Sequence, residues 1–302
     1  MVGSPHLLLR DVAFDVEPGE ILGIVGESGS GKTMASLAVI GLLPNAIELR
    51  GGSIKLEGTE LTGAADTTGR SSADVSMIFQ QPRSALNPTM RAGRQVARVL
   101  ETNQDLSKTD AKAEAIEMLQ HVGIPGAERV ARAYPHQLSG GMCQRVMIAM
   151  ALACKPRLLI ADEPTTALDV TIQAQIFDLI RSLVDEIGCG VLFITHDLAA
   201  VSEMCDRVVV MYGGQVMERA GMAELLDDPE HPYSRYLLEA VEKEVDHRVT
   251  DVGVNFALTG CRFSHRCPQA YEACNEFPPL YPVGENHTSA CFLNKEGRVV
   301  AS

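Results

Sequence analysis

The stretch Gly26-Glu27-Ser28-Gly29-Ser30-Gly31-Lys32-Thr33 decides the fold class of this chain. It matches G-x-x-x-x-G-K-[ST], in which glycines let the backbone wrap closely around phosphate groups. Residues 21–25 before it predict a buried strand, and residues 33–43 after it predict an apolar helix. Backbone N–H groups and the helix N-terminus then face the phosphates. This order predicts a nucleotide site in which Lys32 reaches the β- and γ-phosphates and the Thr33 hydroxyl binds Mg²⁺.

The composition excludes several classes of protein. With 302 residues, the chain is long enough for one large or two modest domains. Its 26 basic and 39 acidic side chains give a net charge of −13, which argues against a nucleic-acid partner, because such partners usually require a basic face. No apolar run of about 18 residues and no signal-peptide layout is present, so we expect cytosolic residence. The eight cysteines then predict thiols or metal ligands rather than disulfides.

Two further apolar runs end in polar residues. Residues 157–161 lead into Asp162 and Glu163, and residues 190–195 lead into His196. Short apolar runs that alternate with helix-length segments predict a parallel sheet, whose ligands bind beyond the carboxyl ends of the strands. We therefore expect Asp162 to hold Mg²⁺, Glu163 to polarise the attacking water, and His196 to contact the γ-phosphate. Taken singly, such residues are more often helix caps or structural; the phosphate loop favours the catalytic interpretation.

A second glycine-rich turn, Leu138-Ser139-Gly140-Gly141-Met142, opens an apolar helix that runs through Ala153. A Ser-Gly-Gly turn is ordinary cap chemistry by itself, but it also forms an anion-binding helix terminus. Together with the loop at Gly26 it is highly specific. Over roughly residues 11–235, the chain resembles the ATP-binding subunit of an ABC transporter.

The resemblance implies a role for each motif. Residues 26–33 resemble the Walker A loop, and residues 158–162 the Walker B strand. Glu163 resembles the catalytic glutamate, and His196 the switch histidine. Residues 138–142, which include Ser139, Gly140 and Gly141, resemble the signature, which in this family completes the ATP site of the opposite subunit. Residues 167–169 resemble the D-loop at the dimer interface.

Gln80 resembles the glutamine of the Q-loop, which in the family touches Mg²⁺ and water and lies near the docking site of the transmembrane partner. Gln81 is adjacent, so the assignment could be off by one residue. Family members also carry a strand and an adenine-stacking aromatic residue upstream of the segment aligned with residues 9–16, which the sequence given does not contain. Cys143 stands where a basic or polar residue is usual after the signature.

The resemblance implies an α/β fold: a P-loop (RecA-like) ABC ATPase core over residues 1–235, with a helical subdomain of about residues 83–150 inserted in it. The residues support the insertion independently, because Ser107-x-x-Asp110 predicts a capping box. One apolar helical face then follows before Gly123. This face consists of Ala115, Met118, Leu119 and Val122.

The remaining residues, 236–302, are expected to form a small Cys-rich extension. Residues 227–233 (D-D-P-E-H-P-Y) resemble the region that follows the core in oligopeptide and dipeptide importer ATPases. Four cysteines crowd into a proline-rich segment: Cys261, Cys267, Cys274 and Cys291. Four thiolates are able to ligate a [4Fe–4S] cluster or a tetrahedral Zn²⁺, although the spacing lacks the C-x₂-C pairs of common zinc sites. Resemblance to peptide-importer ATPases, which includes Arg-Cys-Pro at the second cysteine, favours the cluster; four free thiols are the alternative.

The other four cysteines, Cys143, Cys154, Cys189 and Cys205, lie in apolar or helical settings and are expected in the core. The resemblance as a whole implies an ATPase subunit that powers an importer, most simply for short peptides, at the cytoplasmic face of the cell membrane. It implies a second, related ATPase subunit, with a homodimer of this chain as the alternative. It also implies two transmembrane permeases and, indirectly, a solute-binding protein. Alternatives are a nickel or other small-solute importer and a soluble, non-transport ABC ATPase.

Overall fold

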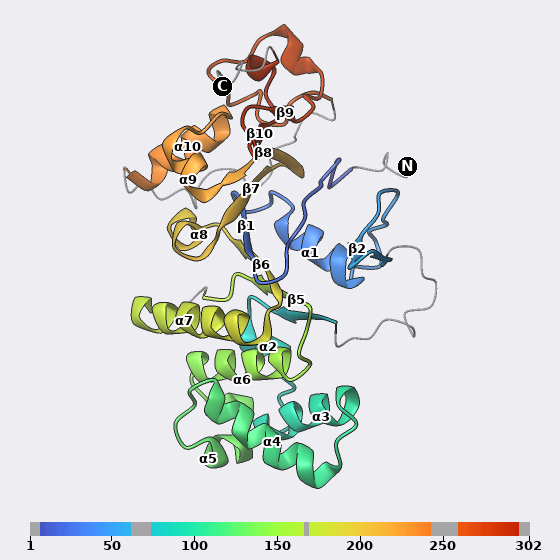
Figure 1. Cartoon of the computed structure of the whole chain (residues 1–302), viewed down its shortest axis with the longest axis vertical. Coiled ribbons are helices and arrows are strands. Elements are labelled where there is room, and N and C mark those ends of the chain that lie inside the picture. The colour runs from blue at the N-terminus through green and yellow to red at the C-terminus, as the bar shows by residue number, and fades with distance from the viewer. Residues whose placement is uncertain (1–6, 62–73, 166–168, 243–258, 296–302) are drawn as a thin grey trace. The chain divides into compact units, whose positions relative to one another are not determined.

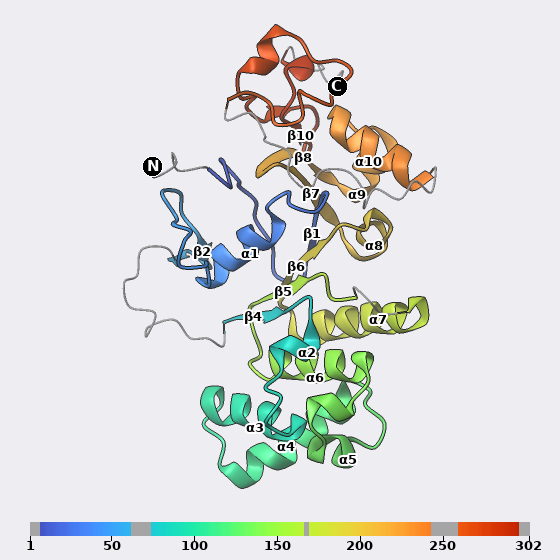
Figure 2. The same ribbon diagram turned by 180° about the vertical axis from the view of Figure 1, so that it is seen from behind.

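The computed structural model describes residues 7–61, 74–165, 169–242 and 259–295 (Figures 1 and 2). The chain divides into two compact units. The first comprises the described parts of residues 1–15, 21–52 and 193–302, and the second those of residues 16–20 and 53–192. Within the described ranges, no helix combines the length and apolar character needed to cross a membrane.

The first unit is built on a mixed sheet. Strand β1 (Ile21–Val25) is buried at every position, as the sequence predicts, and pairs in parallel with β7 (Arg207–Tyr212). Strand β7 then turns back into the antiparallel β8 (Gln215–Gly221), so the expectation of a purely parallel sheet is wrong on this side. The physical reason lies in the dipeptide Gly213-Gly214, which is typical of a two-residue hairpin turn.

The C-terminal segment adds two short strands to this sheet. Strand β10 (Thr288–Ser289) pairs with β8 and with β9 (Tyr281–Pro282), both antiparallel, so the extension continues the sheet of the core (Figure 1). The helices of this unit are α1 (Lys32–Ile40), α8 (Leu198–Met204), α9 (Met222–Asp227) and α10 (Pro232–Glu242), with 3-10 turns η4 (Glu272–Asn275) and η5 (Phe292–Asn294). Helix α1 ends three residues before the predicted end, because Gly41 adopts a left-handed C-cap.

The second unit pairs β4 (Val75–Ile78) in parallel with β5 (Leu158–Asp162), with Ile78 opposite Ala161. A short hairpin joins β2 (Lys55–Leu56) to β3 (Thr59–Glu60). The predicted strand at residues 190–195 is β6 (Gly190–Thr195), which begins in this unit and ends in the first.

Helices form most of the second unit. They are α2 (Pro82–Ala85), α3 (Ala92–Asn103), α4 (Lys108–His121), α5 (Ala127–Arg132), α6 (Gly140–Leu152) and α7 (Val170–Ile187), with the 3-10 turn η2 (Pro135–Gln137). Helices α3 to α6 pack together (Figures 1 and 2). Ser107 caps α4 by accepting a hydrogen bond from the N–H of Asp110, as predicted. The expected apolar face is buried at Ala115, Leu119 and Val122 and half-buried at Met118.

Candidate functional site

The phosphate-loop motif lies between β1 and α1 in the first unit. Gly31 is the N-cap of α1, with a φ of 97° that favours glycine, and no side chain caps the helix. Gly26 packs so closely on β7 that an added Cβ would lie 2.1 Å from the carbonyl oxygen of Met211. An uncapped helix terminus behind a tightly held glycine loop is suited to bind anions.

Lys32 lies folded over this loop. Its Nζ donates to the carbonyl oxygens of Gly26 at 2.7 Å and Glu27 at 3.0 Å, and to Ser30 Oγ at 3.3 Å. The side chain is buried, so the ammonium group is held inside the curve of the loop. The next residue, Thr33, is exposed at the first turn of α1. A cation within the loop and a hydroxyl at its edge are the groups that a nucleotide phosphate and its metal ion need.

Glu27 has a partner that the sequence pattern does not predict. Arg266 of the C-terminal segment donates from Nη1 to Glu27 Oε2 at 2.8 Å and from Nη2 to Oε1 at 3.1 Å. Burial lowers the pKa of Arg266, but the hydrogen bonds to Glu27 and to Tyr212 outweigh this effect and raise it. The motif around Arg266 draws attention through its cysteine, and no local signal marks the arginine as a neighbour of residue 27.

In the second unit, Gln80 and Glu163 meet at one edge of the β4–β5 pair. Gln80 Nε2 donates to Glu163 Oε2 at 2.6 Å. The parallel register, with Ile78 opposite Ala161, carries both residues just beyond the strand ends. The neighbouring Gln81 points elsewhere, because its Oε1 accepts from Ser84 Oγ. Glu163 has a φ of 47°, which is unusual for a residue with a side chain and is often found at functional sites.

The other predicted residues lie at the ends of their strands. Asp162 is the last residue of β5 and is buried. His196 directly follows β6, is exposed, and belongs to the first unit, as does the Gly26–Thr33 loop. Of the expected D-loop, residues 167 and 168 lie outside the described ranges. Asp169 is the N-cap of α7, where its Oδ1 accepts from the N–H of Ile172 at 3.0 Å.

The Ser-Gly-Gly turn opens α6, as predicted. Ser139 is the N-cap, and its Oγ accepts from the N–H of Met142 at 3.2 Å. Gly140 and Gly141 form the first turn, where both are half-buried. Arg83 of α2 donates to the carbonyl oxygen of Leu138 at 3.0 Å. The helix that follows Gln80 therefore directly contacts the turn that starts α6.

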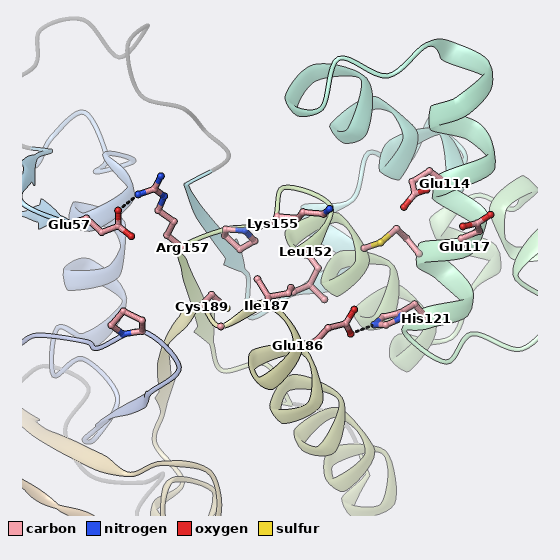
Figure 3. A pocket seen from close by; sticks show the side chains of 14 residues that line it. Glu57, Glu114, Glu117, His121, Leu152, Lys155, Arg157, Glu186, Ile187 and Cys189 are labelled. Carbon is pink, nitrogen blue, oxygen red and sulfur yellow. Dashed lines mark hydrogen bonds and ion pairs between the residues drawn. The ribbon is translucent and has the colours of Figure 1, made fainter.

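A separate pocket of about 650 Å³ opens elsewhere in the second unit. Figure 3 shows its charged lining, in which His121 of α4 pairs with Glu186 of α7 at 3.1 Å and Arg157 pairs with Glu57. The other charged residues of the lining are Glu114, Glu117 and Lys155. None of the residues predicted for nucleotide or metal binding lines this pocket, so it is no part of the predicted site.

The four cysteines of the C-terminal segment share one small cavity. Cys261, Cys267, Cys274 and Cys291 all line a space of about 10 Å³, together with apolar and aromatic side chains. Such a volume is about that of one water molecule. Burial raises the pKa of Cys261 to about 11, and the proximity of the other three thiols adds to the rise. Among the residues that the structure describes, no three His, Cys, Asp or Glu side chains are arranged to hold a metal ion. The donor chemistry thus suits a thiolate-bound metal, whereas the arrangement of the thiols does not form a ligand set.

The remaining cysteines agree with the expectation of a core position in three cases. Cys143, Cys189 and Cys205 are buried, and Cys154 is half-buried. Burial raises the pKa of Cys143, Cys154 and Cys189, which makes them poor nucleophiles at neutral pH.

A buried ion pair attaches the extension to β8. Glu218 is fully buried, and its Oε1 lies 2.6 Å from His287 Nε2. The carboxylate also accepts from the N–H groups of Glu230 and His231 at 2.8 and 2.9 Å. Burial raises the pKa of Glu218, but these hydrogen bonds, with His287 first, lower it overall. Burial likewise lowers the pKa of His287, but Glu218 raises it overall.

Comparisons with known proteins agree with this geometry. Residues 9–166 match the family model described as ABC transporter, and residues 217–274 match the oligopeptide/dipeptide transporter C-terminal region. The chain is 45% identical to the oligopeptide transport ATP-binding protein AppD of Bacillus subtilis, over 97% of this chain and 93% of that protein. It is 42% identical to the dipeptide transport ATP-binding protein DppD of Haemophilus influenzae, over 98% and 93%.

Solved structures give the same result. A dimeric ATP-binding cassette in a post-hydrolysis state, bound to ADP and phosphate, is similar with a TM-score of 0.62 and 30% identity, over 71% of this chain and 90% of that one. An ATP-binding subunit of an ABC transporter is similar with a TM-score of 0.60 and 27% identity, over 72% and 85%. The chain belongs to the ATP-binding subunits of the ABC transporter family and carries the C-terminal region of its oligopeptide and dipeptide transporters.

Proposed function

We propose that this chain hydrolyses ATP to power the import of short peptides. The observation that carries the proposal is the contact of Gln80 with Glu163 at the end of β5, in a chain that also holds an intact phosphate loop. The peptide class is supported by relatives named for oligopeptide and dipeptide transport and by the matching C-terminal region.

The proposal assigns a role to each site residue. The backbone of residues 26–31 and the Lys32 ammonium bind the phosphates. Glu163 accepts the proton of the attacking water, and Gln80 orients it, while His196 contacts the γ-phosphate. Thr33, Asp162 and Gln80 would hold Mg²⁺, which when bound neutralises charge on the phosphate oxygens.

The site is completed by a second subunit. Ser139, Gly140 and Gly141 would contact the γ-phosphate bound by a partner ATPase, which we propose to be a related chain in a heterodimer. Two transmembrane permeases and a solute-binding protein complete the assembly, so the chain would act at the cytoplasmic face of the membrane. Helices from about residue 83 to residue 150 would form a helical subdomain inserted in an ATPase core at residues 1–235. Residues 236–302 would form the extension.

The test compares the isolated chain with the complete assembly in proteoliposomes. We expect slow ATP hydrolysis by the isolated chain and faster hydrolysis once the partner ATPase and permeases are present, because half of each site comes from the partner. Short peptides, but not nickel, should then accumulate in an ATP-dependent manner. Ser139→Arg should abolish the stimulation, because its bulk would conflict sterically with the phosphates and the Ser139 Oγ cap of α6 would be lost. Equal rates for the isolated chain and the assembly would contradict the shared site.

We further propose that Cys261, Cys267, Cys274 and Cys291 hold a [4Fe–4S] cluster. The support is the chemistry of four thiols that line one cavity, which would have to widen beyond the volume of one water molecule to admit the cluster. Anaerobically purified protein should contain about four irons and four acid-labile sulfides per chain. Stoichiometric zinc without sulfide would replace the cluster by a structural Zn²⁺ site. Four titratable thiols without metal would reject both.

A further inference from the structure

One turn of the C-terminal extension contacts the phosphate loop. Arg266 and Glu27, which are 239 residues apart, form a two-pronged ion pair at 2.8 and 3.1 Å. Their side chains are only 18% and 12% exposed, so solvent screens this pair less than it screens a surface salt bridge. Paired N–H···O bonds between a guanidinium and a carboxylate also fix orientation.

Aromatic side chains hold the Arg266 guanidinium in place. The Arg266 guanidinium lies 4.9 Å from the ring centre of Tyr236 and 5.8 Å from that of Phe263. Its Nη1 also donates to the Tyr212 hydroxyl at 3.3 Å. These rings come from α10, the extension and β7. The guanidinium is therefore held in place before any ligand binds.

The main chain of Glu27 is held by Tyr233, whose ring centre lies 4.7 Å from that of Tyr212 and 5.2 Å from that of Phe263. The Glu27 N–H donates to the hydroxyl of Tyr233 at 3.0 Å, and Tyr233 is fully buried. The carbonyl oxygen of Glu27 accepts from Lys32 Nζ at 3.0 Å. A displacement of Glu27 would therefore displace a partner of the lysine that is proposed to bind the phosphates.

The ion pair compensates the negative charge of Glu27 in the phosphate loop. A carboxylate in a loop that receives a polyanion repels that ligand, and the repulsion is strong where water is excluded. Arg266 neutralises this carboxylate and occupies both of its oxygens. We infer that Arg266 is a positioning residue of the nucleotide site, supplied by the C-terminal extension, which neutralises Glu27 and fixes the first turn of the phosphate loop. The inference rests on the proposed binding of ATP by this loop.

The test measures binding of a fluorescent ATP analogue to the full chain. Arg266→Ala should weaken binding by about tenfold, because the Glu27 charge is then unpaired beside the phosphates. In a Glu27→Gln background, the same substitution should change affinity by less than about twofold, since the charge that Arg266 neutralises is gone. A purely structural role would not produce this rescue. Arg235→Ala is the matched control, because Arg235 is an arginine of α10 that donates to the Pro229 carbonyl instead of the loop, and this variant should bind the ATP analogue as wild type does.

Arg266→Lys provides a second variant that keeps the charge but loses the paired geometry. We expect its affinity for the ATP analogue to fall between those of wild type and Arg266→Ala. In the Glu27→Gln background, these differences in affinity should disappear. Two results would overturn the inference: unchanged binding by both Arg266 variants, or a loss in the Glu27→Gln background as large as the loss in the wild-type background. A wild-type chain that binds no ATP analogue would instead overturn the proposed function.

Discussion

Two glutamates of the predicted nucleotide site, Glu163 and Glu27, differ in the side chain that donates hydrogen bonds to them. Glu163 accepts a hydrogen bond from the uncharged amide of Gln80 at the end of the β4–β5 pair. Glu27 accepts two from the charged guanidinium of Arg266. An amide orients a carboxylate without cancelling its charge, whereas a paired guanidinium neutralises it. The comparison teaches that the charge of Glu27 is compensated by an arginine, whereas the amide of Gln80 orients Glu163, which suits the proposed role of Glu163 as a base.

The largest expected effect comes from removing the base. Glu163→Gln should lower ATP turnover in the assembled transporter by about 10³-fold, because only water activation is lost, while ATP binding is nearly retained. Glu27→Gln should lower turnover by less than about tenfold. Steady-state hydrolysis and nucleotide binding, measured on both variants, check this contrast. Similar losses of turnover in the two variants would remove the distinction between the glutamates.

The attachment of the extension gives the next largest effect. His287→Gln should destabilise the chain by about 3 kcal/mol near pH 5.5, since it removes one partner of the buried pair with Glu218. The pKa of His287 is raised, so its contribution is complete below its unfolded value of 6.5 and is lost as the pH rises through the raised value. The pKa of Glu218 is lowered, so its contribution is complete above 4.5 and is lost as the pH falls further.

Thermal unfolding at about pH 5.5 and about pH 9 measures this effect. The gap between wild type and His287→Gln should be large at the lower pH and small at the higher one. The exposed His136 supplies the control, and His136→Gln should leave both melting temperatures unchanged. A gap of the same size at both pH values would show that the charge of His287 does not stabilise the extension.

Two adjacent glutamines, Gln80 and Gln81, test how Glu163 is held. Gln80→Ala should lower turnover by about tenfold, because Glu163 loses a hydrogen-bond donor that orients it. Gln81→Ala should have little effect on turnover, because the side chain of Gln81 contacts only a residue of its own helix among the hydrogen bonds described, Ser84. Measuring ATP hydrolysis by both variants decides which glutamine acts with Glu163. A larger loss for Gln81→Ala would shift the Q-loop assignment by one residue.

The smallest effect is expected at the cysteine next to Arg266. The N–H groups of Arg266 and Cys267 both donate to the Phe263 carbonyl at 3.0 Å, so the two residues share one turn. Cys267→Ser should change affinity for the ATP analogue by less than about threefold, because this turn keeps its main-chain hydrogen bonds. Cys154→Ser, in the second unit, is the control. A loss as large as that of Arg266→Ala would indicate that the arginine depends on the state of the four thiols.

Much of the nucleotide site follows from local sequence. The loop from Gly26 to Thr33 needs only a strand before it and a helix after it, so adjacent residues determine both its shape and its chemistry. Glu163 follows an apolar run whose burial favours parallel pairing, whereas the strand before Gln80 alternates half-buried and buried residues, so the assignment of Gln80 depends on the family resemblance. Helix ends such as those at Ser107 and Ser139 are also local, because each cap is made by a residue three positions away.

Other features depend on contacts that no local pattern encodes. The sequence alone identified four cysteines in the extension, but only the tertiary structure shows them around one cavity. The extension joins the sheet of the core because β8 and β10 pair across 69 positions, and the Arg266–Glu27 pair joins residues still further apart. A motif determines the chemistry of its own residues because their neighbours are fixed by the chain. Folding decides which charged residue lies against a motif, because the local sequence around an arginine does not show whether its side chain is exposed or paired.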